Sequence, residues 1–480
     1  MVGWQSVAGL IALLGVACAG LPPKPKPAQL ADTAPVDLEA GGGDWPAKEW
    51  WKRYQDPTLD QLIELAMESA PSLSTAQARF DSARQSVRVA GAASGARVDA
   101  NASMERERLS ENGLFPPELL GFTWYNQADL GLQASYTFDW WGKQRDAVQS
   151  AVDQAHAAQA DRSAAALMLA SSIADTYFGW QADQSRIALA RQRASLVQQE
   201  GSIAAARVRA DLDAVEAVHS SDLNLAAARE HIAALEGSAK LRLVALAGLI
   251  GHSVADLPPL QPRPLPALTG NLPDDVKIDL ISRRADITAS RWRVEAAEKD
   301  LLSARAEFYP DFTINALAGF SSIDAGTLLE YGSRVPQIGA ALHLPIFDAG
   351  RLKARYGARQ AAIDSAVAGY QETVVNAARD VATQASTRAQ VGAERAQRVI
   401  EVDAARQLQG SAAARVRQGI VDPRAELAAT ESWIDQRDVL LQLDAAALSA
   451  DIALQRALGG GYESPEKLVN SHSTATTTRP

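Results

Sequence analysis

Residues 128–143 read Ala-Asp-Leu-Gly-Leu-Gln-Ala-Ser-Tyr-Thr-Phe-Asp-Trp-Trp-Gly-Lys, and they contain the change that decides the fold. Up to Asp139, apolar and polar side chains alternate with period two, which predicts a strand with one apolar and one polar face. From Lys143 to about residue 206 the chain has no Pro and only two Gly. This predicts a helix of roughly 64 residues, about 95 Å long at 1.5 Å per residue.

The same succession of features occurs twice in the chain. The matching segments, in chain order, are Ser72–Ala83 and Asp286–Ala297, Ala100–Ala102 and Ile314–Ala316, Thr137–Lys143 and Ile346–Arg351, and Arg207–Arg209 and Arg415–Arg417. Four matches in a kept order predict two internal repeats. The repeats are expected at 49–257 and 277–462, with a Pro-rich connector at 258–276.

Each repeat is expected to contain a helix, two strands and two long helices. In the first repeat we expect strands at about 97–107 and 128–138 and long helices at about 143–206 and 214–250. In the second we expect strands at about 311–321 and 337–347 and long helices at about 351–417 and 424–458. Their Ala-rich sequences favour close packing between helices.

Composition excludes several classes of function. The chain has 480 residues, 47 Lys+Arg against 57 Asp+Glu, six dispersed His and one Cys. A net charge of −10 argues against a nucleic-acid partner. One Cys excludes a disulfide framework or a Cys-based metal site. We find no nucleophile–base pair, metal-ligand spacing or phosphate loop, so we expect no catalytic residue, no metal, no cofactor and no enzymatic activity.

The four strands have the length that crosses a bilayer as tilted β-strands, about 9–11 residues. An aromatic cluster, Tyr136, Phe138, Trp140 and Trp141, gathers at one end, as a membrane interface requires. The alternative is a half-buried sheet of a soluble domain. Four strands cannot close a barrel, and open edges are not tolerated in lipid. Membrane strands therefore predict an α+β membrane protein: a trimeric 12-stranded barrel, four strands per chain, continued by a barrel of long helices.

The turns between the long helices carry charge. They read Arg207-Val-Arg-Ala-Asp-Leu-Asp213 and Arg415-Val-Arg-Gln-Gly-Ile-Val-Asp-Pro423. Helix capping explains part of this, with Gly419 ending one helix, and Asp422 and Pro423 starting the next. The alternative is functional: in a closed ring, Asp211, Asp213 and Asp422 would form acidic rings that favour cations and help to set a gate.

The N-terminus predicts export. Residues 6–17 form an apolar run of roughly 12 residues, too short to span a membrane, so 1–17 are interpreted as a signal peptide. Cys18 follows directly, and Gly15-Val-Ala-Cys18 is similar to a bacterial lipobox. Covalent lipidation of Cys18 and ordinary cleavage at a small-x-small site are both open. Residues 18–48 are expected to be a lipid-anchored tether, and 463–480 a disordered tail.

Taken together, the chain resembles the TolC-like outer-membrane efflux family, in its OprM/NodT-type lipoprotein branch. The residues that carry the resemblance are Trp50–Tyr54, Asp56–Leu59, Ala70–Leu73, Ser135–Lys143, Arg283–Ile287, Leu344–Arg351 and Ala457–Tyr462. Tyr309-Pro310 and Gly319–Ser322 look most like the fusaric-acid-resistance and aromatic-drug subgroup.

The resemblance implies a homotrimeric exit duct in the outer membrane of a Gram-negative bacterium, with a large periplasmic part. The duct would work with a periplasmic adaptor and an inner-membrane pump. It implies adaptor docking at the helical tips, through Arg207, Leu212, Arg415, Gly419, Ile420 and Val421, and an acidic entrance at Asp422. The near alternative is a conduit for type I protein secretion, and a different class is a coiled-coil periplasmic scaffold or adaptor.

Overall fold

The computed structural model describes residues 22–23, 25–35, 42–112, 116–268, 273 and 276–463. The expected signal peptide, Cys18 and residues 464–480 lie outside the described residues. The chain divides into two units. Unit 1 comprises Met1–Leu30, Asp81–Ala157 and Arg291–Gly369, and unit 2 comprises Ala31–Phe80, Ala158–Ser290 and Tyr370–Pro480.

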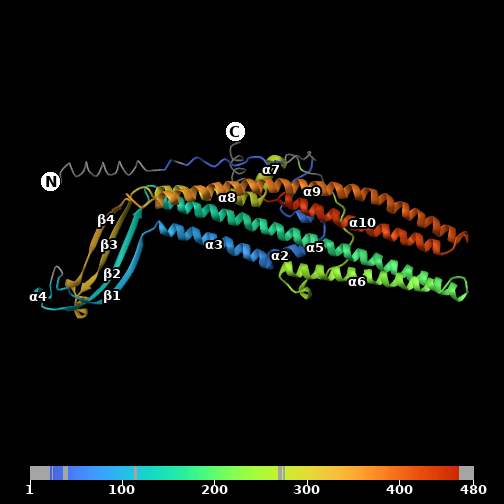
Figure 1. Cartoon of the computed structure of the whole chain (residues 1–480), viewed down its shortest axis with the longest axis horizontal. Helices are drawn as coiled ribbons and strands as arrows, with labels where there is room; N and C mark the ends of the chain where they lie inside the picture. The colour runs from blue at the N-terminus through green and yellow to red at the C-terminus, as the bar shows by residue number, and fades with distance from the viewer. Residues whose placement is uncertain are drawn as a thin grey trace, which may run out of the picture. The chain divides into compact units, whose positions relative to one another are not determined.

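Unit 1 contains a four-stranded antiparallel sheet in the order β1-β2-β3-β4 (Figure 1). Its strands are β1 (Arg97–Arg108), β2 (Trp124–Phe138), β3 (Asp311–Ser322) and β4 (Gln337–His343). β2 begins four residues before the expected 128, because its first residues extend the pairing with β1 as far as Trp124 opposite Arg108. β4 ends at His343 rather than at 347, since Pro345 has no N–H to donate to a ladder.

The sheet has two faces of opposite character, because residues directly opposite in an antiparallel pair point to the same side. One face is apolar and includes Val98, Ala100, Met104, Leu130, Leu132, Tyr136, Phe138, Phe312, Ile314, Phe320, Ile338 and Leu342. The other face is polar and includes Asp99, Asn101, Ser103, Glu105, Gln127, Asp129, Gln133, Thr137, Thr313, Asn315 and Ser321. On the polar face the hydroxyls of Thr137 and Thr313 lie 2.9 Å apart.

Short elements connect the strands. α4 (Pro117–Leu120) lies between β1 and β2, and the 3₁₀ turns η3 (Ala325–Thr327) and η4 (Tyr331–Ser333) lie between β3 and β4.

The strands are joined to the long helices at their other ends. The helices are α3 (Pro71–Ala93), α5 (Lys143–Arg209), α8 (Ala285–Ala306) and α9 (Arg351–Arg417). α5 and α9 each have 67 residues. α5 therefore runs three residues beyond the expected 206. None of the described helices is long and apolar enough to cross a membrane.

Unit 2 contains the distal parts of α5 and α9 and the helices that return from them. These are α6 (Glu216–Ile250) and α10 (Arg424–Ala457), 35 and 34 residues long. The remaining elements are η1 (Trp50–Tyr54), α2 (Pro57–Ser69), η2 (Val254–Asp256) and α7 (Val276–Arg283).

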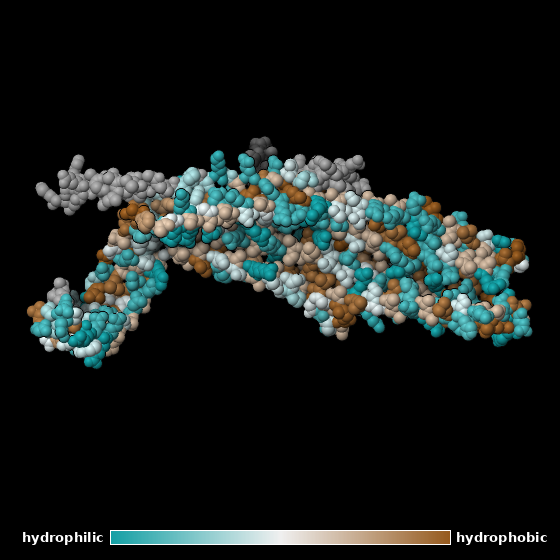
Figure 2. Space-filling view, viewed as in Figure 1, coloured by the Kyte–Doolittle hydropathy of each residue, from teal (hydrophilic) through white to brown (hydrophobic). Residues whose placement is uncertain are grey.

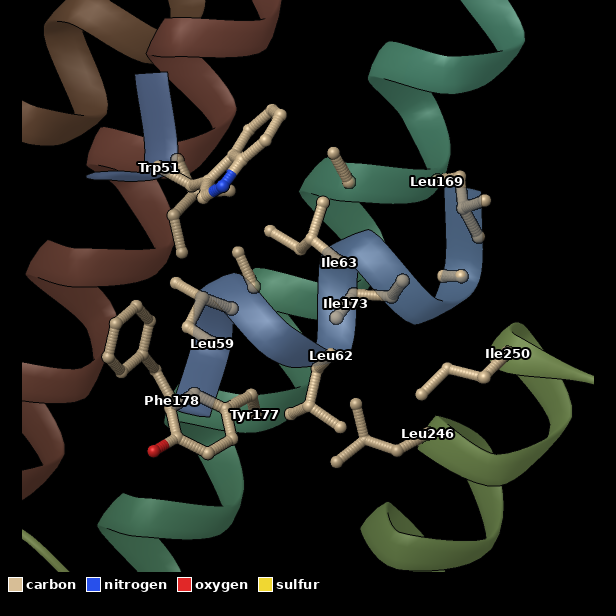
Figure 3. Packing of buried hydrophobic residues seen from close by; sticks show 14 of the residues in the cluster. Trp51, Leu59, Leu62, Ile63, Leu169, Ile173, Tyr177, Phe178, Leu246 and Ile250 are labelled. Atoms are coloured by element: carbon tan, nitrogen blue, oxygen red, sulfur yellow. The ribbon is translucent and has the colours of Figure 1, made fainter. Parts of the chain in front are cut away.

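The largest apolar cluster of unit 2 forms around α2, whose residues meet α5 and α6 (Figure 3). Leu59, Leu62 and Ile63 are completely buried. Asp56 starts α2, because its Oδ1 accepts the N–H groups of Thr58 and Leu59. Its Oδ2 accepts a 2.8 Å hydrogen bond from the Tyr177 hydroxyl. Burial and this bond raise the pKa of Tyr177 to about 12, so the hydroxyl stays a donor.

A buried carboxylate ties η1 to the long helices. Asp451 of α10 is fully buried and accepts a 2.8 Å hydrogen bond from the Tyr54 hydroxyl. Arg388 of α9 lies 3.5 Å from its other oxygen. The charge of Asp451 is thus compensated, as a buried ion requires.

Candidate functional site

The turn between α5 and α6 (tip 1, residues 207–215) reverses the chain through a Schellman motif. The N–H of Leu212 donates to the Arg207 carbonyl at 2.9 Å, and the N–H of Asp211 donates to the Val208 carbonyl at 3.0 Å. Asp211 holds the left-handed position, with φ 57°. Glycine is the usual residue there, because a side chain makes this conformation costly.

The turn between α9 and α10 (tip 2, residues 415–423) has the same hydrogen bonds. The N–H of Ile420 donates to the Arg415 carbonyl at 3.0 Å, and that of Gly419 to the Val416 carbonyl at 2.9 Å. Gly419 has φ 70° and takes the place of Asp211. The two tips are therefore equivalent in backbone, although the first has no glycine. Each exposes a large apolar side chain, Leu212 at 64% and Ile420 at 61%, and hydrophobic residues are visible at both tips (Figure 2).

The start of α10 uses Asp422 as a cap. The helix is assigned from Arg424, one residue after Pro423, and Asp422 Oδ1 accepts the Arg424 N–H at 2.8 Å. Pro423 already has helical backbone angles (φ −50°, ψ −27°), so, counted from Pro423, Arg424 is the second residue and receives the bond that an N-cap carboxylate makes.

Two arginines pair with the tip aspartates. Arg207 binds Asp213 in a bidentate manner, Nε to Oδ2 at 2.7 Å and Nη2 to Oδ1 at 3.0 Å. These bonds lower the pKa of the Asp213 carboxyl. Arg424 reaches back to Asp422, Nη2 to Oδ2 at 3.1 Å. The Arg424 side chain and its N–H together lower the pKa of Asp422.

The same arginine connects the tips of one chain. Arg424 Nη1 lies 4.0 Å from Asp213 Oδ2, so Arg207, Asp213, Arg424 and Asp422 form one chain of ion pairs. Within 207–213 and 415–424 there are five Arg and three Asp, a formal charge of +2. The aspartates are therefore not an isolated acidic cluster within one chain.

Two predicted tip residues remain outside this network. The side chains of Asp211 and Arg415 are exposed and form no hydrogen bond or ion pair with any residue that the structure describes. Arg415 differs from its equivalent Arg207 because Val421 stands where tip 1 has Asp213. Tip 2 thus presents a free guanidinium beside Gly419 and Ile420.

The predicted aromatic residues of unit 1 lie together where the sheet meets the helices. Tyr136 and Phe138 have ring centroids 4.9 Å apart, and Phe138 and Trp140 are 5.7 Å apart. Phe312 stacks on Trp140 at 5.2 Å, and Tyr309 stacks on Trp141 at 4.5 Å. Trp140 and Trp141 remain 64% and 46% exposed.

An extended N-terminal segment is held beside the same end of the sheet. Arg305 Nε donates to the Pro22 carbonyl at 3.1 Å, and the Tyr356 hydroxyl donates to the Pro23 carbonyl at 3.1 Å. Ala28 N–H donates to Glu298 Oε1 at 2.6 Å. Arg305 lies at the end of α8, a few residues before β3 begins.

Within the described residues, no group of three or more His, Cys, Asp or Glu is placed to hold a metal ion. The chemistry available at the tips and on the sheet is ion pairing, hydrogen bonding and apolar contact.

Comparison with known proteins identifies the architecture. The model of the outer membrane efflux protein family matches residues 62–252 and 279–460, on either side of the Pro-rich connector. The chain belongs to the outer membrane efflux protein family. It is an outer-membrane protein, as the sequence predicts.

Relatives and solved structures of this family agree over nearly the whole chain. The multidrug resistance outer membrane protein MdtP of Escherichia coli K12 is 32% identical over 450 residues, 92% of this chain and 91% of MdtP. The outer membrane protein VceC of Vibrio cholerae is 32% identical, with a TM-score of 0.77 over 87% of this chain and all of VceC. The outer-membrane channel OprN is 26% identical, with a TM-score of 0.82 over 92% and 99%.

Sequence reasoning missed three residues of these sites. Arg424 pairs with two of the predicted aspartates, and Phe312 and Tyr309 complete the aromatic cluster. A signal existed for Phe312, which is an apolar residue at an alternating position inside the expected strand 311–321. Nothing in the sequence signals that Arg424 reaches Asp213, because that contact depends on how two tips 211 residues apart meet.

Proposed function

We propose that three copies of the chain form the outer-membrane exit duct of a tripartite efflux system, which exports small molecules such as drugs or aromatic compounds. The observation that supports this most strongly is the two-faced sheet with two free edges. β1 and β4 are the edge strands, and an open edge in lipid leaves N–H and C=O groups unpaired. Because the sheet has four alternating strands, β4 of one copy would meet β1 of the next in antiparallel sense. Three copies would close 12 strands.

The two halves of the chain support a repeat origin of this architecture. Each half contains two strands followed by a helix of 67 residues and a returning helix of 34 or 35. In the proposed trimer the six pairs of long helices form the periplasmic barrel, and no enzymatic step is involved.

The tips are proposed as the place of gating and docking. Asp422, Asp211 and Asp213 would line the periplasmic entrance, with Asp422 and Asp213 held by arginines in the state described here. A periplasmic adaptor, itself joined to an inner-membrane pump, would dock on Leu212 and on the free tip 2, Arg415, Gly419, Ile420 and Val421. Arg207 would contribute less, since Asp213 already satisfies its guanidinium.

Lipidation of Cys18 is proposed on positional grounds. Cys18 precedes Pro22 by four residues, a reach of at most about 14 Å. Pro22 and Pro23 are fixed near the aromatic end of the sheet, where the proposed membrane interface lies. A lipid on Cys18 would be within reach of that interface. Labelling with palmitate, comparing native protein with Cys18→Ala, tests this directly.

The central experiment detects the closure between copies. In a Cys18→Ser background, Asn101→Cys in β1 is combined with single cysteines placed in turn along Gln337–His343 of β4. Oxidation is expected to yield covalent dimers and trimers at one register. The control pairs Asn101→Cys with Gly131→Cys, which lie opposite each other within one chain and should crosslink without changing its mass. A monomer that needs no detergent and forms no ion-conducting channels in planar bilayers would overturn the proposal.

The exported cargo distinguishes the proposed small-molecule efflux duct from a conduit for type I protein secretion. A duct for type I protein secretion would restore export of a secreted protein when supplied to cells lacking their own duct. We expect restored drug resistance instead, because MdtP, which is 32% identical to this chain, is named a multidrug resistance protein.

A further inference from the structure

The C-terminal end of β1 carries four charged residues, and the strand geometry places the two acidic side chains on one face and the two basic side chains on the other. Residues 105–108 read Glu-Arg-Glu-Arg, and successive side chains of a strand point to opposite faces. Glu105 and Glu107 therefore lie on the polar face, opposite Gln127 and Tyr125. Arg106 and Arg108 lie on the apolar face, opposite Asn126 and Trp124.

Side-chain contacts agree with this sorting. The Tyr125 hydroxyl donates a hydrogen bond to Glu107 on the polar face. On the other face, the Arg106 guanidinium lies 5.6 Å from the centroid of the Trp124 ring, within the range of a cation–π contact. Arg106 is not paired with Glu105 or Glu107, although they are its neighbours in sequence.

A third arginine lies on the same face of the sheet. Arg334 forms an isolated bridge with Phe320, and Phe320 belongs to the apolar face through its partner Leu130. Its guanidinium lies 4.3 Å from the Tyr331 ring centroid. Arg106, Arg108 and Arg334 are all exposed. Arg108 donates a 3.0 Å hydrogen bond to Glu111, but both side chains are more than half exposed, so solvent screens the pair.

Arg106 and Arg108 lie where the apolar band ends, and Arg334 lies within it, in the row of Phe320, Leu130 and Ala102. Met104 opposite Ala128 is the last apolar pair before Arg106, which is the next residue on that face. The other end of the band carries Tyr136, Phe138 and Trp140. Hydrophilic side chains gather at the end of the sheet that lies away from the helices (Figure 2). An arginine at the border of a lipid-facing band meets headgroups rather than acyl chains.

We propose that Arg106, Arg108 and Arg334 bind phosphate groups of the outer-leaflet lipid; this rests on the proposed function, in which the apolar face meets the membrane. The guanidinium fork matches phosphate geometry, and Trp124 and Tyr331 supply the amphipathic rings typical of an interface. Closure between copies would place Arg334, which precedes β4, on the same membrane-facing side as Arg106 and Arg108 of the following β1. Each of three such sites would span a subunit boundary.

The test uses the purified full-length protein in detergent and measures its thermal unfolding as lipid A carrying two phosphates is added. We expect stabilisation of the native protein, and none from dephosphorylated lipid A or from inorganic phosphate. Arg106→Gln/Arg108→Gln should require roughly twenty-five-fold more lipid for half the effect, because each arginine near an anionic lipid surface contributes about a factor of five. The matched control, Glu105→Gln/Glu107→Gln, changes the same strand on its other face and should bind as the native protein does.

Equal lipid dependence in the arginine variant and the native protein would overturn the inference, as would equal stabilisation by dephosphorylated lipid A or inorganic phosphate. Ion conductance of each variant in planar bilayers distinguishes failure of this inference from failure of the proposed function. A variant that conducts like the native protein still forms the proposed channel, whatever its lipid binding. If the glutamine variant does not fold, Arg106→Lys/Arg108→Lys keeps the charge without the fork and should bind with intermediate strength.

Discussion

Arg207 and Asp213 form a two-bond ion pair across tip 1, with N–O distances of 2.7 and 3.0 Å, and this pair places Asp213 within 4.0 Å of Arg424 in tip 2. The two tips of one chain are therefore held together through a single carboxylate. Loss of Asp213 would therefore free Arg207 and remove the link between the tips, leaving Arg424 paired with Asp422 alone.

Replacement of Asp213 by Ala should raise channel opening in planar bilayers by a factor of about two to five, a modest effect because both partners are solvent-accessible. The control is Asp222→Ala in α6, an aspartate that forms no hydrogen bond or ion pair with the residues described. Equal conductance in the two variants would show that the ion pair does not restrain the tips.

Asp422 allows capping and gating to be separated. Asp422→Asn removes the charge that faces Arg424 but keeps an oxygen that can accept the Arg424 N–H. Asp422→Ala removes both. If charge restrains the entrance, both variants should conduct more than the native channel. Hydrogen exchange in the first turn of α10 should accelerate only in the Ala variant. Increased conductance in the Ala variant alone would leave Asp422 as a cap.

The same ion pairs predict a pH dependence. The pKa values of Asp213 and Asp422 are both lowered by their arginine partners. A lowered pKa in the folded state means that the stabilisation is present at and above the ordinary Asp value, and disappears as pH falls through the lowered one. Conductance should therefore be flat from pH 7 to 5 and rise only below about pH 4. A rise between pH 7 and 5 would assign the titration to another group.

Much of this architecture is visible in the sequence, because it depends on local patterns. Alternation marks the strands, and the absence of Pro across α5 marks its length. What the sequence does not reveal is set by contacts between distant segments. Tip 1 has Ala210-Asp211 where tip 2 has Gln418-Gly419, yet Asp211 adopts the left-handed conformation of Gly419 and the hydrogen bonds are the same. The Arg424–Asp213 contact arises only when the tips meet.

Contacts with residues distant in sequence explain why glycines occupy positions 459–461. All three glycines have positive φ, and a Cβ on Gly459 would lie 2.0 Å from the Arg283 carbonyl oxygen. Gly459→Ala should destabilise the protein by about 3 kcal/mol or more, from backbone strain and overlap together. Gly237→Ala is the matched control, since a Cβ there meets nothing within 4 Å and a helix interior favours Ala by about 0.5–1 kcal/mol. Similar unfolding temperatures for the two variants would contradict the role of this junction.

Asp211 offers a final test of the equivalence between the tips. With φ 57° it occupies a position that costs a non-glycine residue about 1 kcal/mol, and its side chain forms no compensating bond with the described residues. Asp211→Gly should therefore slow hydrogen exchange at the Asp211 and Leu212 amides by up to about fivefold. Ala210→Gly, one residue earlier and not at positive φ, should accelerate it, because glycine there adds only freedom in the unfolded turn. If both substitutions accelerate exchange, the left-handed conformation of Asp211 carries no measurable strain, and the prediction is wrong.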